Sequence, residues 1–275
     1  MSNCKVIALT NQKGGVGKTT TAVNLGVSLV QQGKKVLLID ADAQANLTMA
    51  LGYNRPDDIP ITLSTVMQNI IDDKTLDASH GIIHHREGVD LLPSNIELSG
   101  FEVRLINAMS RERVLKTYVN EVKKNYDYVL IDCMPSLGMI TINALAAADS
   151  VIIPTQPHYL SAKGLELLLR SVSMVKRQIN PKLRIDGILM TMVMPRTNIS
   201  KEITATVKSA YGQKIKVFDT EIPHSIRAVE ATAEGKSIFA YDKSGKVAAA
   251  YEQFGKEVAE IGEKQRKQNR ADRIR

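Results

Sequence analysis

The sequence predicts an α/β fold, a single three-layer α/β/α domain with a mostly parallel sheet. Short apolar runs alternate with longer segments of helical period, which is the pattern of βαβ units with helices on both faces of a sheet. The first run leads into a glycine-rich loop and then a helical segment, the context that a phosphate-binding loop requires. At 275 residues the chain has a length that one α/β domain commonly reaches.

Seven apolar runs are expected to be strands. Most are rich in Val, Ile and Leu, as strands buried on both faces of a parallel sheet should be. The expected strands lie at residues 5–10, 35–40, 89–93, 126–132, 150–155, 185–193 and 215–218. The polar segment 52–88 has only weak periodicity, so we interpret it as an excursion at the edge of the sheet.

Apolar residues at helical spacing predict eight helices. They lie at residues 18–32, 97–108, 111–125, 140–148, 162–179, 200–211, 225–234 and 245–275. The last one loses its apolar face after Ile261, and from there basic residues outnumber acidic ones. We therefore expect residues 1–262 to form the domain and residues 263–275 to form a basic tail that frays.

Bulk composition restricts the class of protein. A formal charge of +7 and a pI near 9.3 suit a polyanionic partner, although a solvated basic face is the plain alternative. Cys4 and Cys133 lie in apolar runs, which predicts buried, reduced thiols rather than a disulfide framework or a metal site. We expect no signal peptide and no membrane span, and hence a cytoplasmic protein.

The glycine loop is the candidate phosphate site. Glycines at 14, 15 and 17 let backbone N–H groups converge on phosphate oxygens, and the helix that follows adds its positive N-terminal dipole. Lys18 then places an ammonium on the β- and γ-phosphates, and Thr19 supplies a hydroxyl to Mg²⁺. The loop predicts a triphosphatase that binds ATP with Mg²⁺.

Three aspartates follow strand ends. Asp40, Asp42 and Asp132 should converge with the loop, because parallel strands bring their carboxyl ends to one crevice. Acids at such positions can also cap helices. We expect Asp132 to hold Mg²⁺ through water, Asp40 to lie with it at the metal, and Asp42 to orient or activate the nucleophile.

Three segments together carry a family resemblance. Residues 10–20 read TNQKGGVGKTT, with Gln12 and then Lys13 where the general pattern begins with glycine; residues 37–44 read LLIDADAQ, and residues 129–138 read VLIDCMPSLG. They resemble the deviant Walker A and carboxylate motifs of the ParA/Soj family of DNA-partitioning ATPases. The resemblance extends from residue 5 to about residue 260.

The resemblance implies a function in plasmid or chromosome partitioning. ATP would join two subunits into a homodimer in which Lys13 reaches the partner's phosphates, and Asp42 would position the attacking water. The ATPase would be weak alone and stimulated by a ParB-like partner. The dimer would bind duplex DNA non-specifically through Arg196 and Arg227 and so associate with the nucleoid.

The resemblance also assigns the remaining contacts. Met192, Pro223 and His224 would lie near the adenine. The expected site is therefore, for catalysis, Lys13, Lys18 and Asp42; for the nucleotide, Lys13, Gly14, Gly15, Val16, Gly17, Lys18, Thr19, Thr20, Met192, Pro223 and His224; for the metal, Thr19, Asp40 and Asp132; and for DNA, Arg196 and Arg227.

The chain departs from the common family form at four places. Ala43 and Ala45 stand where proline and glycine are usual, and His224 where arginine is frequent. Lys163 stands where relatives usually carry glutamate, which puts the usual polar contact between subunits in doubt.

Three alternatives use the same fold. A MinD-like membrane ATPase would need an amphipathic end, and residues beyond 261 offer only Ala271 and Ile274 as apolar side chains. A ParA-like protein can also position a cargo other than DNA. A reductase subunit like the nitrogenase iron protein would need two loop cysteines, which neither Cys4 nor Cys133 supplies.

Overall fold

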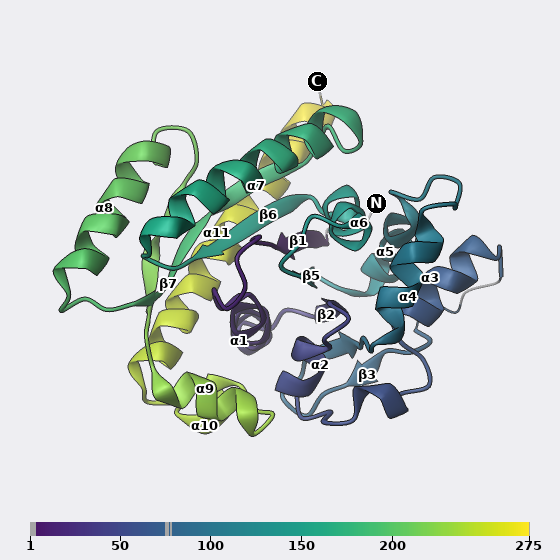
Figure 1. Ribbon diagram of the computed structural model, residues 1–275, viewed down its shortest axis with the longest axis horizontal. Helices are drawn as coiled ribbons and strands as arrows, with labels where there is room; N and C mark the ends of the chain where they lie inside the picture. The colour runs from purple at the N-terminus through teal and green to yellow at the C-terminus, as the bar shows by residue number, and fades with distance from the viewer. Residues whose placement is uncertain (1–3, 75–76, 78, 275) are drawn as a thin grey trace.

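One eight-stranded sheet forms the middle layer of the computed structural model, which describes residues 4–74, 77 and 79–274 (Figure 1). The strand order is β3-β4-β2-β5-β1-β6-β7-β8, and all neighbours pair in parallel except β3 and β4. The strands are β1 (Lys5–Leu9), β2 (Val36–Ala41), β3 (Ile83–His84), β4 (Asp90–Leu92), β5 (Tyr128–Cys133), β6 (Ser150–Thr155), β7 (Arg184–Val193) and β8 (Val217–Pro223). The predicted α/β class is confirmed.

Helices cover both faces of this sheet (Figure 1). One layer contains α3 (Leu63–Ile71), α4 (Glu97–Leu105), α5 (Val114–Val122), α6 (Met139–Ala147), α7 (Tyr159–Gln178) and α8 (Asn198–Tyr211). The other contains α1 (Lys18–Gln31), α2 (Asn46–Ala50), α9 (Ile226–Ala233), α10 (Ile238–Tyr241) and α11 (Lys246–Ile274). Short 3-10 turns lie at Pro56–Asp58 and Lys123–Asn125.

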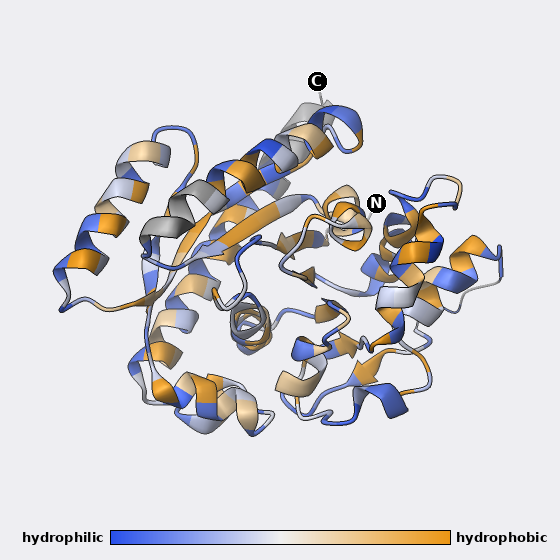
Figure 2. Cartoon of the chain, viewed as in Figure 1, coloured by the Kyte–Doolittle hydropathy of each residue, from blue (hydrophilic) through white to orange (hydrophobic). Residues whose placement is uncertain are grey.

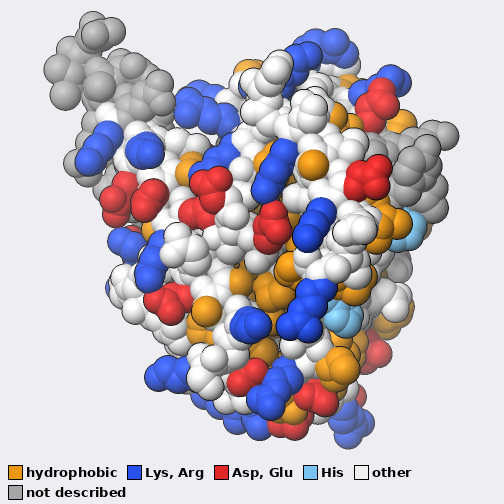
Figure 3. Space-filling model, turned by 90° about the vertical axis from the view of Figure 1, so that its left-hand side faces the viewer, with side chains coloured by type: hydrophobic (Ala, Val, Ile, Leu, Met, Phe, Trp, Pro, Cys, Tyr) orange, Lys and Arg blue, Asp and Glu red, His pale blue; other side chains and the backbone are white. Residues whose placement is uncertain are grey.

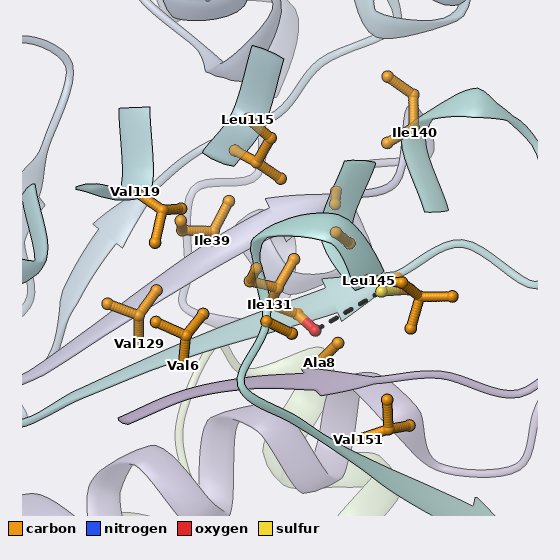
Figure 4. Close-up of a cluster of buried hydrophobic side chains, with 14 of the residues drawn as sticks. Val6, Ala8, Ile39, Leu115, Val119, Val129, Ile131, Ile140, Leu145 and Val151 are labelled. Atoms are coloured by element: carbon orange, nitrogen blue, oxygen red, sulfur yellow. Dashed lines mark hydrogen bonds between the residues drawn. The ribbon is translucent and has the colours of Figure 1, made fainter. Parts of the chain in front are cut away.

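The two-sided cover explains the continuous apolar strands. Along β1, Val6 and Ala8 belong to one buried cluster, and Ile7 and Leu9 belong to the other. Figure 4 shows the first cluster, where β-strand side chains meet Leu115 and Val119 of α5 and Ile140 of α6. Strand side chains point alternately to the two faces, so burial on both requires apolar residues at every position, as the orange strands of Figure 2 show.

The segment interpreted as a polar excursion contains a packed helix, so that interpretation is wrong for its middle part. α3 buries Leu63, Val66 and Met67 against the sheet. Thr62 caps the helix in a reciprocal capping box with Thr65. Flanking polar residues dilute the apolar spacing in a sequence window, whereas the fold needs only one apolar face nine residues long.

The two neighbouring histidines have different surroundings. The side chain of His84 is 83% exposed. His85 is only 8% exposed, and its ring meets Tyr53 edge-on with 6.3 Å between centroids. The turn after β3 brings the His85 ring to this buried position.

The chain's end remains helical. α11 extends to Ile274, through the segment expected to fray. Beyond the last apolar residue of that face, Gln265 Nε2 donates to the buried Asp186 Oδ1 at 3.0 Å, so polar contact with the sheet continues after Ile261. The division at residue 262 stays a prediction. Neither Cys4 nor Cys133 forms a disulfide within the described residues; Cys133 is buried as expected, whereas Cys4 is only half-buried.

Candidate active site

The glycine loop lies between β1 and α1, at the carboxyl end of the sheet. Gly15 and Gly17 have φ angles of 69° and 81°, a left-handed conformation that glycine adopts without a Cβ penalty. Gly14 and Gly15 are exposed, and a Cβ built on either one would meet nothing within 4 Å. The loop therefore leaves room beside its backbone for a phosphate group to approach.

Side chains from other strand ends hold the loop. Asn11 Nδ2 donates to Pro154 O of β6 at 2.7 Å, and Asn11 Oδ1 accepts from the backbone N–H of Lys13 at 3.1 Å. Thr191 Oγ1 of β7 donates to Val16 O at 2.8 Å. Asn11 and Thr191 were not predicted as site residues, because their role depends on β6 pairing with β1 and β7 pairing with β6.

Lys18 is the first residue of α1, directly after the glycine loop. It is 8% exposed, and its Nζ lies 3.4 Å from Lys13 O. Burial lowers the pKa of Lys18, and the nearby Asp132 acts in the opposite direction. An ammonium removed from water beside open backbone is well placed to bind an anion, since desolvated charges interact strongly.

Thr19 and Asp132 meet at the start of α1. Thr19 Oγ1 donates to Asp132 Oδ2 at 2.6 Å, while Asp132 Oδ1 is buried and has no hydrogen-bond partner among the described residues. Burial raises the pKa of Asp132 to about 8, and the charge of Asp40 adds to the rise. A hydroxyl beside an unsatisfied buried carboxylate oxygen is an oxygen donor set that Mg²⁺ prefers, so these residues fit the expected metal.

Asp40 is held by the turn that follows β2. It is fully buried opposite Asp132 in the β2–β5 register. Its Oδ2 accepts from the backbone N–H and the Oγ1 of Thr48 at 2.8 and 2.7 Å, and its Oδ1 accepts from Asp42 N at 3.2 Å. Burial raises its pKa to about 7. These three donors fix the Asp40 side chain in the turn, and its expected place at the metal stays a prediction.

Asp42 directly follows β2, two residues after Asp40. It is 8% exposed, and its Oδ1 accepts from Gln44 N at 3.0 Å. Its carbonyl accepts from Ala45 N at 2.9 Å. Ala45 has a φ of 51°, a left-handed conformation that costs an L-residue about 1–2 kcal/mol, which accounts for the glycine usual at this place.

The residues assigned to the adenine gather at the ends of β7 and β8. Met192 has a φ of 52°, and its Cε lies 3.7 Å from the Cβ position of Gly17. Pro223 pairs with Val193, and His224 N donates to Val193 O at 3.0 Å. The structure thus places Met192 against the glycine loop and the other two on the adjacent strand end.

The two arginines assigned to DNA lie on exposed segments after β7 and β8. Arg196 is exposed in the loop before α8 and makes no ion pair within the described part of the chain. Arg227 on α9 is 63% exposed, and its Nη1 lies 3.1 Å from Asp242 Oδ1. Figure 3 shows the face that carries α8 and α9, where basic and acidic side chains are interspersed.

Carboxylates also neutralise other basic residues of this face. Lys208 pairs with Glu221 at 2.9 Å, and Lys216 pairs with Glu257 at 3.5 Å. These lysines therefore add less positive charge than their number suggests. The side chain of Lys163 lies outside those that the structure describes, so its effect at the subunit seam stays a prediction.

Comparisons with known proteins find relatives along nearly the whole chain. A family model described as an AAA domain matches residues 4–185. The sporulation initiation inhibitor protein Soj of Bacillus subtilis is 44% identical over 94% of this chain and 99% of its own length. The chromosome partitioning protein ParA of Myxococcus xanthus is 38% identical over 92% of this chain and 87% of its own length.

A solved structure shares the whole architecture. The cobyrinic acid a,c-diamide synthase of Mycobacterium smegmatis, with a bound ATP analogue and magnesium, superposes with a TM-score of 0.80 at 35% identity. The match covers 92% of this chain and 93% of that one. Within the residues described here, no helix combines the length and the apolar composition needed to cross a membrane.

Proposed function

Since this chain belongs to the ParA/Soj family of P-loop ATPases, we propose that it is a partitioning ATPase that converts ATP and water to ADP and phosphate. The partitioning proteins Soj and ParA are 44% and 38% identical to it, against 35% for the diamide synthase. The ranking favours transport of a DNA cargo over amide synthesis. ATP and Mg²⁺ are its cofactors, in agreement with the ligands of the solved relative.

The contact between Thr19 and Asp132 beside the open glycine loop carries this proposal. It brings a hydroxyl from the first turn of α1 to a buried carboxylate on β5. In the sequence these groups are far apart, and a phosphate-and-metal site gives a reason to bury an acid with one oxygen unsatisfied.

The residues divide the work of hydrolysis. The glycine loop and Lys18 bind the β- and γ-phosphates, and their fixed positive charge stabilises the transferring group. Thr19 and Asp132 would hold Mg²⁺, which would supply positive charge to neutralise the phosphates. Asp42 orients the attacking water and accepts its proton. Gly14, Gly15, Val16, Gly17 and Thr20 shape the phosphate pocket.

ATP is also proposed to control assembly. Lys13 is half-buried on the outer part of the loop and would contact the γ-phosphate held by a second copy of the chain. ADP lacks that phosphate, so the two nucleotides differ in affinity for the dimer and shift its population. Hydrolysis would return the chain to the monomer.

The assembled dimer is proposed to bind duplex DNA through Arg196 and Arg227. The ion pair with Asp242 partly neutralises the charge of Arg227. Phosphate contacts are sensitive to salt and indifferent to base sequence. A DNA-bound ParB-like partner would stimulate hydrolysis and release the dimer. The protein would accordingly be found on the nucleoid in the cytoplasm, without a membrane partner.

The direct test is ATPase activity with Mg²⁺, alone and with duplex DNA plus the candidate ParB-like protein. We expect weak basal turnover, strong stimulation by both together, and no turnover in Lys18→Ala. Sedimentation with anionic liposomes and ATP is the second arm. Robust lipid binding, or turnover that DNA and the partner leave unchanged, would contradict the proposal.

A further inference from the structure

Gln156 connects three parts of the site that have separate expected roles. It follows the last residue of β6 and is half-buried. Its Nε2 donates to Gly15 O at 2.8 Å and also contacts Met192 Sδ, while its Oε1 accepts from Lys13 Nζ at 3.5 Å. One side-chain amide therefore touches the phosphate loop, the adenine side and the lysine expected to cross to a second subunit.

The chemistry of the neighbours fixes the orientation of this amide. Gly15 O can only accept and the Lys13 ammonium can only donate. A reversed amide would place Oε1 against a carbonyl oxygen and NH₂ against an ammonium, so both contacts would become repulsive. Amide orientation is assigned from such networks, and here every polar group of Gln156 has a matching neighbour.

The two hydrogen bonds differ in strength. The bond to Gly15 O has the usual length for N–H···O, whereas 3.5 Å from Lys13 is at the long limit. A phosphate oxygen offers Lys13 a shorter bond in which both donor and acceptor are charged, whereas the Gln156 oxygen is neutral. Lys13 will therefore exchange Gln156 for an anion while the bond to the loop stays in place.

We propose that Gln156 is a positioning residue with two tasks. It fixes the phosphate loop through Gly15 O, and it gives Lys13 a weak, neutral acceptor in the unassembled chain, from which the lysine transfers to the partner's nucleotide. The second task rests on the proposed ATP-dependent dimer. Neutrality of the acceptor is the essential property, because a carboxylate at the same place would retain Lys13 as an ion pair.

Two variants separate these tasks. Gln156→Leu removes both hydrogen bonds at similar size, and Gln156→Glu removes the donor to Gly15 O but adds a charged acceptor for Lys13. Gln178→Glu, at the exposed end of α7, is the control for the added charge. ADP affinity of the monomer is measured by calorimetry, and the monomer–dimer midpoint by sedimentation with Mg²⁺ and a saturating non-hydrolysable ATP analogue.

We expect both Gln156 variants to bind ADP about three- to ten-fold more weakly, the effect of one lost hydrogen bond. The dimer midpoint should rise at least about ten-fold in Gln156→Glu relative to Gln156→Leu, because a charged pair must be broken. In the ADP-bound monomer, the NMR signal of Lys13 Nζ should move in Gln156→Glu. All three readouts should be unchanged in Gln178→Glu.

Equal dimer midpoints in the two Gln156 variants would overturn the proposed transfer of Lys13. ADP affinities within two-fold of the parent would overturn the loop-holding task. A parent protein that stays monomeric with the ATP analogue would instead refute the dimer switch itself, and the ADP and NMR readouts would still decide whether Gln156 holds the loop and Lys13.

Discussion

Replacing Arg196 by alanine should weaken DNA binding more than replacing Arg227. Arg196 has no ion pair within the described residues, whereas Arg227 must give up Asp242 at 3.1 Å before it can contact a phosphate. A dimer displays each arginine twice, and each lost phosphate contact lowers the slope of log K against log salt by about 0.9. Arg196→Ala should therefore lower the slope by about 1.8, which at about 0.1 M salt corresponds to roughly sixty-fold in affinity.

The Arg227 pair reduces that effect. An exposed ion pair contributes about 0–1 kcal/mol, and breaking it offsets up to roughly five-fold of the gain from each phosphate contact. Arg227→Ala should accordingly cost less than Arg196→Ala. Asp242→Asn should free Arg227 and strengthen binding, which is the opposite sign from both arginine variants.

The assay is fluorescence anisotropy of a random-sequence duplex between about 50 and 300 mM salt (a six-fold range, about 0.8 of a decade, chosen to resolve a slope), with a non-hydrolysable ATP analogue present. Arg184→Ala is the matched control, because Arg184 is an exposed arginine at the opposite end of β7. An unchanged slope for Arg196→Ala, or an equal loss for Arg184→Ala, would refute the placement of DNA at the ends of β7 and β8.

Three further predictions address the nucleotide site. Asp42→Ala should lower hydrolysis by about 10²–10⁴-fold and retain the ATP-dependent dimer, as phosphate release and light scattering will show; a monomeric variant would contradict the role of Asp42. Lys18→Ala should abolish ADP binding, whereas Lys13→Gln should keep it and lose the dimer, which calorimetry and sedimentation can separate. In the absence of Mg²⁺ and nucleotide, the raised pKa values of about 7 for Asp40 and about 8 for Asp132 mean that the folded chain holds more protons than the unfolded chain. The contribution of these two carboxyls to stability is then complete below about pH 4 and falls as pH rises through 7 and 8. Urea unfolding from pH 5 to 9 will test this, and Asp132→Asn should flatten the fall.

The strands and the phosphate loop could be predicted because their causes are local. A strand that is buried on both faces has an unbroken run of apolar residues in the sequence. The loop needs glycine at positions such as Gly15 and Gly17, because their φ angles are positive. All seven expected strands exist, with ends shifted by up to five residues at β8. The two-residue β3 is too short to leave a pattern.

The supports of the loop could not be predicted, because they depend on which strands become neighbours. Asn11 reaches Pro154 and Lys13 reaches Gln156, and each pair is separated by 143 positions in the chain. Neither residue of such a pair lies in a local sequence pattern that identifies its partner. A weak cue exists in Gln156, a polar residue directly after a buried strand, which is the place where ligand-facing side chains gather in a parallel sheet.

The three aspartates show why position alone does not assign a role. All three lie at strand ends, but their oxygens meet different partners: Asp40 accepts three hydrogen bonds, Asp42 accepts one from the turn, and Asp132 keeps one oxygen without a partner. A carboxylate that accepts three hydrogen bonds is fixed in the fold, whereas an unsatisfied buried oxygen calls for a ligand. Because Asp40 and Asp132 face each other in register, the charge on one opposes ionisation of the other. A bound cation would offset this repulsion, and we expect Asp132 to hold it.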